Sequence, residues 1–138
     1  MPRSVLIVED ESLLARTLAK ALRDAGYTAV TAESADEAAR HLFPASSFDV
    51  VLLDQRLPRG SGMSILEQMR AAGMQTPVIV MTAFDTAAMR AQAQELSVSG
   101  FFRKPFNLAE MLGRIAELAG SNGDQARGSS GTAPKNGL

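Results

Sequence analysis

Short apolar runs recur along the chain, and each run ends on polar or charged residues. These terminal residues are Glu9-Asp10, Asp54, Thr82 and Lys104-Pro105. Segments with helical periodicity separate the runs, a pattern typical of buried strands in a parallel sheet that is covered on both faces. In such sheets the carboxyl ends of the strands converge on one crevice. The sequence therefore predicts one site with three carboxylates, a hydroxyl and an ammonium, which together suit a divalent cation and a phosphoryl group.

Length, charge and composition exclude several classes of protein. A chain of 138 residues fits one domain that buries roughly 68% of its unfolded surface. The net charge of −1 gives no electrostatic footprint for nucleic acid or an anionic membrane. The absence of cysteine excludes disulfides, thiolate catalysis and cysteine-based zinc sites. No apolar stretch reaches the roughly 18 residues of a membrane span, and no signal-peptide pattern is present, so we expect a cytoplasmic protein.

Helix start and stop signals divide the chain into five strand–helix alternations. The helices are predicted from Glu11 or Ser12 to Ala25-Gly26, from Ser34 to about Leu42, across Ile65–Met69 to Gly73, from Asp85 or Thr86 to about Leu96, and from Asn107 to Gly120. Ser34 and Glu37 have the spacing of a capping box. Residues 121–138 are rich in Gly, Ser, Asn and Ala, which predicts a domain over residues 1–120 followed by a flexible tail or the start of a linker.

The ordered set of motifs resembles the receiver domains of two-component response regulators. The matching segments are Val8-Glu9-Asp10-Glu11, Asp54-Gln55-Arg56-Leu57-Pro58 with Gly62, Met81-Thr82-Ala83, and Gly100-Phe101-Phe102-Arg103-Lys104-Pro105-Phe106. The resemblance covers about residues 3–119. It implies an α/β fold of the flavodoxin-like, doubly wound type, with one five-stranded parallel sheet of order 2-1-3-4-5 and five helices.

The resemblance also implies a role for each acidic residue. Asp54 would be the phosphoacceptor, which takes a phosphoryl group from a sensor histidine kinase or a phosphotransfer protein and forms an acyl phosphate. Asp10 would bind Mg²⁺ directly beside Asp54, and Glu9 would hold it through water. The backbone carbonyl of Arg56 would complete the protein ligands, in keeping with the preference of Mg²⁺ for oxygen.

The remaining motif residues would bind the phosphoryl group and report its arrival. Lys104 would pair first with the carboxylates and then with a phosphoryl oxygen, and a cis bond to Pro105 would aim its ammonium inward. Thr82 would donate its hydroxyl to the phosphoryl group. Phe101 occupies the aromatic switch position, where many family members carry Tyr, so its inward state would depend on packing alone.

Two rival classes fail on named residues. Phosphatases with an aspartyl-phosphate intermediate need a second acid two residues after the nucleophile, where this chain has Arg56. A dinucleotide-binding domain needs a glycine-rich turn after the first strand, where Glu9-Asp10-Glu11 would repel a pyrophosphate. We therefore expect a signalling domain and no enzyme, one that catalyses only its own phosphorylation and dephosphorylation.

The output of the domain stays open between two alternatives. The chain is either the N-terminal part of a transcriptional regulator or a stand-alone phosphorelay or adaptor protein. In both cases we expect phosphorylation to switch the face of the fourth helix, fifth strand and fifth helix, with phosphorylation-dependent homodimerisation as the response. Two features support this expected switching face. The helix Asp85–Leu96 is poorly amphipathic, and Phe101 and Arg103 point to the same side of their strand. We expect neither nucleic-acid nor membrane binding by this segment.

Overall fold

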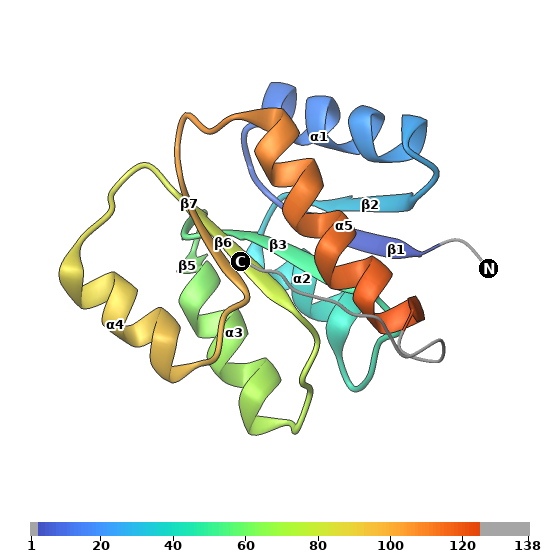
Figure 1. Ribbon diagram of the computed structural model, residues 1–138. Coiled ribbons are helices and arrows are strands. Elements are labelled where there is room, and N and C mark those ends of the chain that lie inside the picture. The colour runs from blue at the N-terminus through green and yellow to red at the C-terminus, as the bar shows by residue number, and fades with distance from the viewer. Residues whose placement is uncertain (1–2, 125–138) are drawn as a thin grey trace.

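The computed structural model describes residues 3–124, which form one central parallel sheet with helices on both faces (Figure 1). The strands of the sheet are β1 (Ser4–Val8), β2 (Thr28–Ala32), β3 (Val50–Asp54), β6 (Val78–Thr82) and β7 (Gly100–Arg103). Their spatial order is β2-β1-β3-β6-β7, and every neighbouring pair is parallel. Numbered along the chain without the short hairpin described below, this order is 2-1-3-4-5. The predicted flavodoxin-like fold is therefore confirmed.

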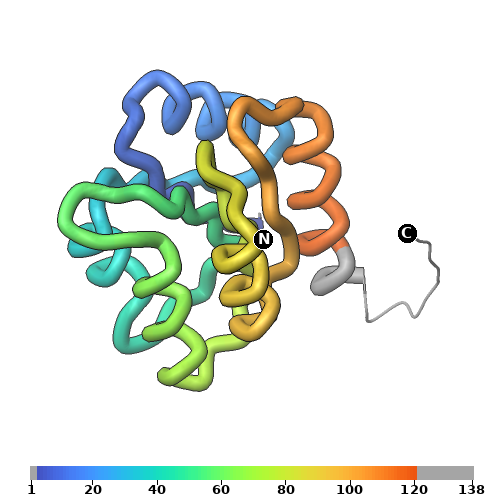
Figure 2. The backbone as a smooth tube through the Cα atoms, turned by 90° about the vertical axis from the view of Figure 1, so that its left-hand side faces the viewer, coloured from blue at the N-terminus to red at the C-terminus, as the bar shows by residue number. Residues whose placement is uncertain are grey.

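Five helices cover the sheet in two layers. They are α1 (Ser12–Asp24), α2 (Ala35–Leu42), α3 (Gly62–Ala71), α4 (Ala87–Glu95) and α5 (Leu108–Asp124). Helices α1 and α5 pack on one face, and α2, α3 and α4 pack on the other (Figures 1 and 2). No helix within residues 3–124 is long and apolar enough to cross a membrane.

The alternation of side chains along the strands fills both layers. Leu6 and Val8 of β1 belong to the core cluster under α2 and α3, whereas Val5 and Ile7 belong to the cluster under α1 and α5. All four are fully buried. Strands buried on both faces read as continuous apolar runs, which explains why the runs in the sequence show no polar alternation.

The local signals at the helix ends work as the sequence indicates. The Ser34 side chain accepts from the backbone N–H of Glu37 at 3.1 Å, while the Glu37 carboxylate accepts from the N–H of Glu33 at 2.9 Å. Gly26 and Gly73 follow α1 and α3 with φ of 99° and 80°, a left-handed conformation that favours glycine. Thr86, one of the two residues predicted to begin the fourth helix, caps α4.

Two local predictions differ from the structure. Helix α5 does not end at Gly120 but continues to Asp124, because a helical glycine costs only about 1 kcal/mol and no proline lies between Gly120 and Asp124. The rest of the predicted tail, residues 125–138, lies outside the described residues. The five predicted strand–helix alternations include no strand between β3 and α3, but the structure has a small antiparallel hairpin there, formed by β4 (Arg56–Leu57) and β5 (Gly60–Ser61).

Candidate functional site

Three carboxylates meet at the carboxyl ends of the two central strands. Glu9 and Asp10 follow β1, and Asp54 is the last residue of β3, whose register pairs Val8 with Leu53. Glu9 and Asp54 are only 1% and 5% exposed, whereas Asp10 lies on the surface. One oxygen from each of the three carboxylates lies within 4.8 Å of the others. The parallel register thus produces the acidic cluster that the sequence predicts.

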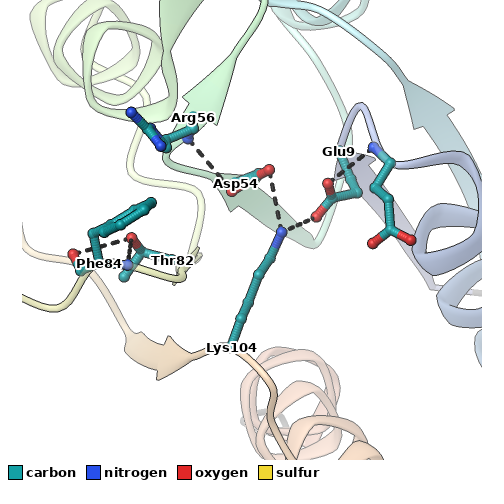
Figure 3. A network of polar contacts seen from close by, with 7 residues as sticks. Glu9, Asp54, Arg56, Thr82, Phe84 and Lys104 are labelled. Carbon is teal, nitrogen blue, oxygen red and sulfur yellow. Dashed lines mark hydrogen bonds and ion pairs between the residues drawn. The ribbon is translucent and has the colours of Figure 1, made fainter.

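Lys104 joins this cluster from the edge of the sheet. Its ammonium donates to Glu9 Oε1 at 2.7 Å and forms an ion pair with Asp54 Oδ2 at 3.2 Å (Figure 3). The backbone N–H of Lys104 donates to the carbonyl of Thr82 at 2.7 Å, which holds the end of β7 beside β6. The Lys104–Pro105 peptide bond, for which the family resemblance implies the cis form, is cis in the structure.

The charges in the cluster perturb one another. Burial, together with the neighbouring carboxylate of Glu9, raises the pKa of Asp54 from 3.8 to about 6, although Lys104 opposes this rise. Burial alone would lower the pKa of Lys104, but its hydrogen bond to Glu9 and the two carboxylates outweigh burial and raise that pKa. Ionisation of Asp54 is therefore less favourable than that of a solvent-exposed aspartate, and further positive charge at the site would favour it.

The donor set fits a hard divalent cation. Three carboxylates and one ammonium leave a formal charge of −2, which a divalent cation would neutralise. All candidate side-chain ligands are oxygens, and the exposed position of Asp10 leaves room for water ligands, which Mg²⁺ usually keeps. The backbone N–H of Arg56 is 3.4 Å from Asp54 Oδ1, so this residue adjoins the phosphoacceptor candidate.

Gln55 and Gly62 hold the loop that follows Asp54. The backbone N–H of Gln55 donates to Met81 at 2.9 Å, its carbonyl accepts from Gly62 at 3.0 Å, and its side-chain oxygen accepts from the N–H of Met63 at 3.0 Å. A Cβ atom on Gly62 would lie 2.5 Å from the carbonyl oxygen of Asp54, so only glycine fits there. Gln55 carries no sequence signal for this role and was missed.

Thr82 lies at the same end of the sheet, but its hydroxyl is bonded within its own loop. Fully buried, it accepts from the backbone N–H of Phe84 at 2.9 Å and lies 3.2 Å from the Phe84 carbonyl. Phe84 is 53% exposed, and the Arg56 guanidinium lies 4.5 Å from the centroid of its ring. The β3 and β6 loops thus contact each other beside Asp54.

Phe101 lies away from the acidic cluster, in the middle of β7. It pairs in register with Val80 and packs, partly buried, against the core cluster under α2, α3 and α4. The guanidinium of Arg90 on α4 lies 4.5 Å from the centroid of its ring. The predicted site residues therefore form two groups, one around Asp54 and Lys104 and one around Phe101.

Comparison with known proteins agrees with this arrangement. The sequence profile of the response regulator receiver domain matches residues 5–116, and the chain belongs to this family. It is 35% identical over 111 residues, 80% of its length, to the transcriptional regulatory protein DltR of Streptococcus agalactiae. It is 39% identical over 121 residues, 88% of its length, to the sensory transduction protein RegX3 of Mycobacterium bovis. The chain spans about half of both relatives, 49% and 52% respectively.

Solved structures support the same family. The non-phosphorylated HemR receiver domain of Leptospira biflexa is 33% identical, with a TM-score of 0.79 over 85% of this chain and 94% of that one. The receiver domain of a putative Luxo repressor protein from Vibrio parahaemolyticus, 24% identical, shares the fold with a TM-score of 0.83 over 94% of this chain and 100% of that one. The protein is thus a receiver domain of the two-component response regulators, a signalling domain.

Proposed function

We propose that Asp54 accepts a phosphoryl group in a Mg²⁺-dependent reaction. The observation that carries this proposal is the convergence of Glu9, Asp10 and Asp54 with the Lys104 ammonium at one end of the sheet. No other set of at least three acidic or histidine side chains within residues 3–124 has comparable metal-binding geometry. The donors would be a sensor histidine kinase or a phosphotransfer protein, as the family membership suggests.

In the proposed reaction a carboxylate oxygen of Asp54 attacks phosphorus. The bond from phosphorus to the donor nitrogen breaks as the acyl phosphate forms. Lys104, now bonded to Glu9 and Asp54, would turn toward a phosphoryl oxygen and offset its charge. Bound Mg²⁺, held by Asp10, Asp54, the Arg56 carbonyl and, through water, Glu9, would supply charge neutralisation during transfer. Both cations favour the ionised Asp54 that the attack requires.

The signal would leave the site through Thr82. Its hydroxyl, which now bonds the Phe84 backbone, would turn toward the phosphoryl group and release the β6–α4 loop. Phe101 would then move toward the vacated space and change the face formed by α4, β7 and α5. Homodimerisation through this face is the proposed response, since α4 contributes only Ala93 to the buried core and can shift at low cost.

The output is proposed from the relatives. DltR is a transcriptional regulatory protein about twice as long as the matched segment. We therefore place this domain at the N-terminal end of a transcriptional regulator. Direct nucleic-acid binding is assigned to another part of such a protein.

Intact-mass spectrometry tests the phosphoacceptor. Incubation with a small phosphodonor and Mg²⁺ should add one phosphate, and hydroxylamine should remove it because acyl phosphates react with this nucleophile. Asp54→Asn and a chelator should each abolish the label. Asp36→Asn, an exposed aspartate in the first turn of α2, is the matched control and should label normally. Undiminished labelling of Asp54→Asn would show that another residue is the acceptor.

A further inference from the structure

An ion pair on the surface anchors α4 to the loop that precedes it. Arg90 Nε donates to Asp85 Oδ1 at 2.6 Å, and Arg90 Nη2 donates to Asp85 Oδ2 at 2.7 Å. This two-point geometry fixes the plane of the guanidinium as well as its distance. The hydrogen bond from Arg90 lowers the pKa of Asp85, so the carboxylate stays ionised and keeps its partner.

The same guanidinium covers the aromatic ring of Phe101. Its central carbon lies 4.5 Å from the ring centroid, within the range of a cation–π contact. Phe101 has no hydroxyl with which to bond the backbone, so its ring position depends on the partly buried packing of β7 and on this contact. Arg90 is therefore a polar restraint on a ring that also packs against the apolar core.

Asp85 connects this restraint to the acidic site. The Thr82 hydroxyl makes both of its hydrogen bonds with the backbone of Phe84, and Asp85 is the next residue along the chain. A shift of this loop would move the carboxylate that anchors Arg90. Contacts therefore run without a gap from Thr82 through Asp85 and Arg90 to Phe101.

We propose that Arg90, anchored by Asp85, is a positioning residue that holds Phe101 in its unphosphorylated place and thereby lowers the affinity of Asp54 for a phosphoryl group. The proposal rests on the proposed function of Asp54. If phosphoryl binding requires the ring to move, every contact that stabilises the present ring position opposes binding. The coupling is reciprocal, so loss of the Arg90 contact must tighten binding at the distant site.

Beryllofluoride, which mimics a phosphoryl group, tests the proposal in the presence of Mg²⁺. The protein is labelled with 4-fluorophenylalanine at its six phenylalanines, and Phe101→Leu assigns the fluorine signal of Phe101. In Arg90→Ala we expect the unliganded Phe101 signal to shift toward its liganded position. The apparent Kd for beryllofluoride should fall about two- to fivefold, as expected for an exposed cation–π contact. Asp85→Asn should act in the same direction.

Two further variants separate this role from a general effect of charge. Lys20→Ala removes one positive charge and one exposed ion pair, to Asp24 on α1, without contact to a ring, and should leave both readouts unchanged. Arg90→Lys keeps the charge but loses the planar fork, and should fall between wild type and Arg90→Ala. An unchanged Kd and fluorine spectrum in Arg90→Ala, or an equal response in Lys20→Ala, overturns the proposal. Failure of the wild type to bind beryllofluoride refutes the proposed function instead, while the fluorine shift in Arg90→Ala still reports on the contact.

Discussion

Asp54→Asn is expected to stabilise the metal-free protein near neutral pH. Burial and the carboxylate of Glu9 raise the pKa of Asp54 from 3.8 to about 6, so the folded state binds the proton of this group more tightly than the unfolded state does. The free energy of unfolding of the wild type should therefore fall as pH rises from about 4 to about 6, and the loss should be complete above pH 6. A neutral amide of similar shape avoids this loss.

The size of the effect follows from the same pKa values. Because the pKa of Asp54 is higher by about two in the folded state than in the unfolded state, its ionisation lowers the free energy of unfolding by about 3 kcal/mol at pH 7. Solvent reaches the site beside the exposed Asp10 and screens part of the repulsion, and the substitution also removes the contact of Asp54 with Lys104 at 3.2 Å. We therefore expect a gain of about 1.5 kcal/mol at pH 7, which should shrink to about a third of that value by pH 4.5.

Urea denaturation in the presence of a chelator, followed by circular dichroism at several pH values, measures this difference. In a second measurement, without chelator, Mg²⁺ at about ten times its Kd should stabilise the wild type by about 1.4 kcal/mol, because it binds the folded state. It should stabilise Asp54→Asn much less. Asp36→Asn is the control: it should lack the gain in stability seen in Asp54→Asn without metal, and Mg²⁺ should stabilise it as much as the wild type. An Asp54→Asn variant that is less stable than the wild type at pH 7 without metal would refute this account of the site's electrostatics.

Two other predictions concern the Asp54 loop and the proposed dimer face. Gly62→Ala should cost about 1–3 kcal/mol and slow phosphorylation, because the new methyl group would press on the Asp54 carbonyl at 2.5 Å. Gly113→Ala, inside α5 and with open space around the new methyl group, should instead stabilise the protein by about 0.5–1 kcal/mol and leave phosphorylation unchanged; denaturation and mass labelling measure both variants. Analytical ultracentrifugation should show a beryllofluoride-dependent dimer of the wild type that Arg103→Glu weakens, and a wild type that stays monomeric when activated would refute the dimer.

The sequence predicts the sheet and the acidic cluster for the same physical reason. Short apolar runs without polar alternation, separated by helical segments, are typical of strands buried on both faces, and parallel strands place their carboxyl ends together. Glu9, Asp54 and Lys104, from three strand ends far apart in the chain, are thus predictable as one site. The ends of most helices are also predictable, because capping residues and glycines are local signals that involve only a few neighbouring residues.

What the sequence does not predict depends on particular side-chain contacts. Nothing in the pattern around Gln55 indicates that its amide oxygen caps α3, because a polar residue after a strand has many possible partners. The placement of Arg90 over Phe101 depends on the angle at which α4 crosses β7, and the weak amphipathicity of α4 does not define that angle. The extension of α5 beyond Gly120 shows that a single glycine is a weak stop signal.

The acidic site lies on the border between a tightly packed and a loosely packed part of the fold. Strands β3 and β6 are buried along their whole length, whereas β7 is only partly buried and α4 contributes one buried residue. Local opening costs least where few apolar contacts are made, so a change at Asp54 should spread toward α4 and β7. Hydrogen exchange with and without beryllofluoride should therefore change over residues 84–103, while the amides of β1 and β3 stay protected. A uniform change across the sheet would contradict this division, because it would mean that the strands holding the carboxylates move as readily as the helix beside them.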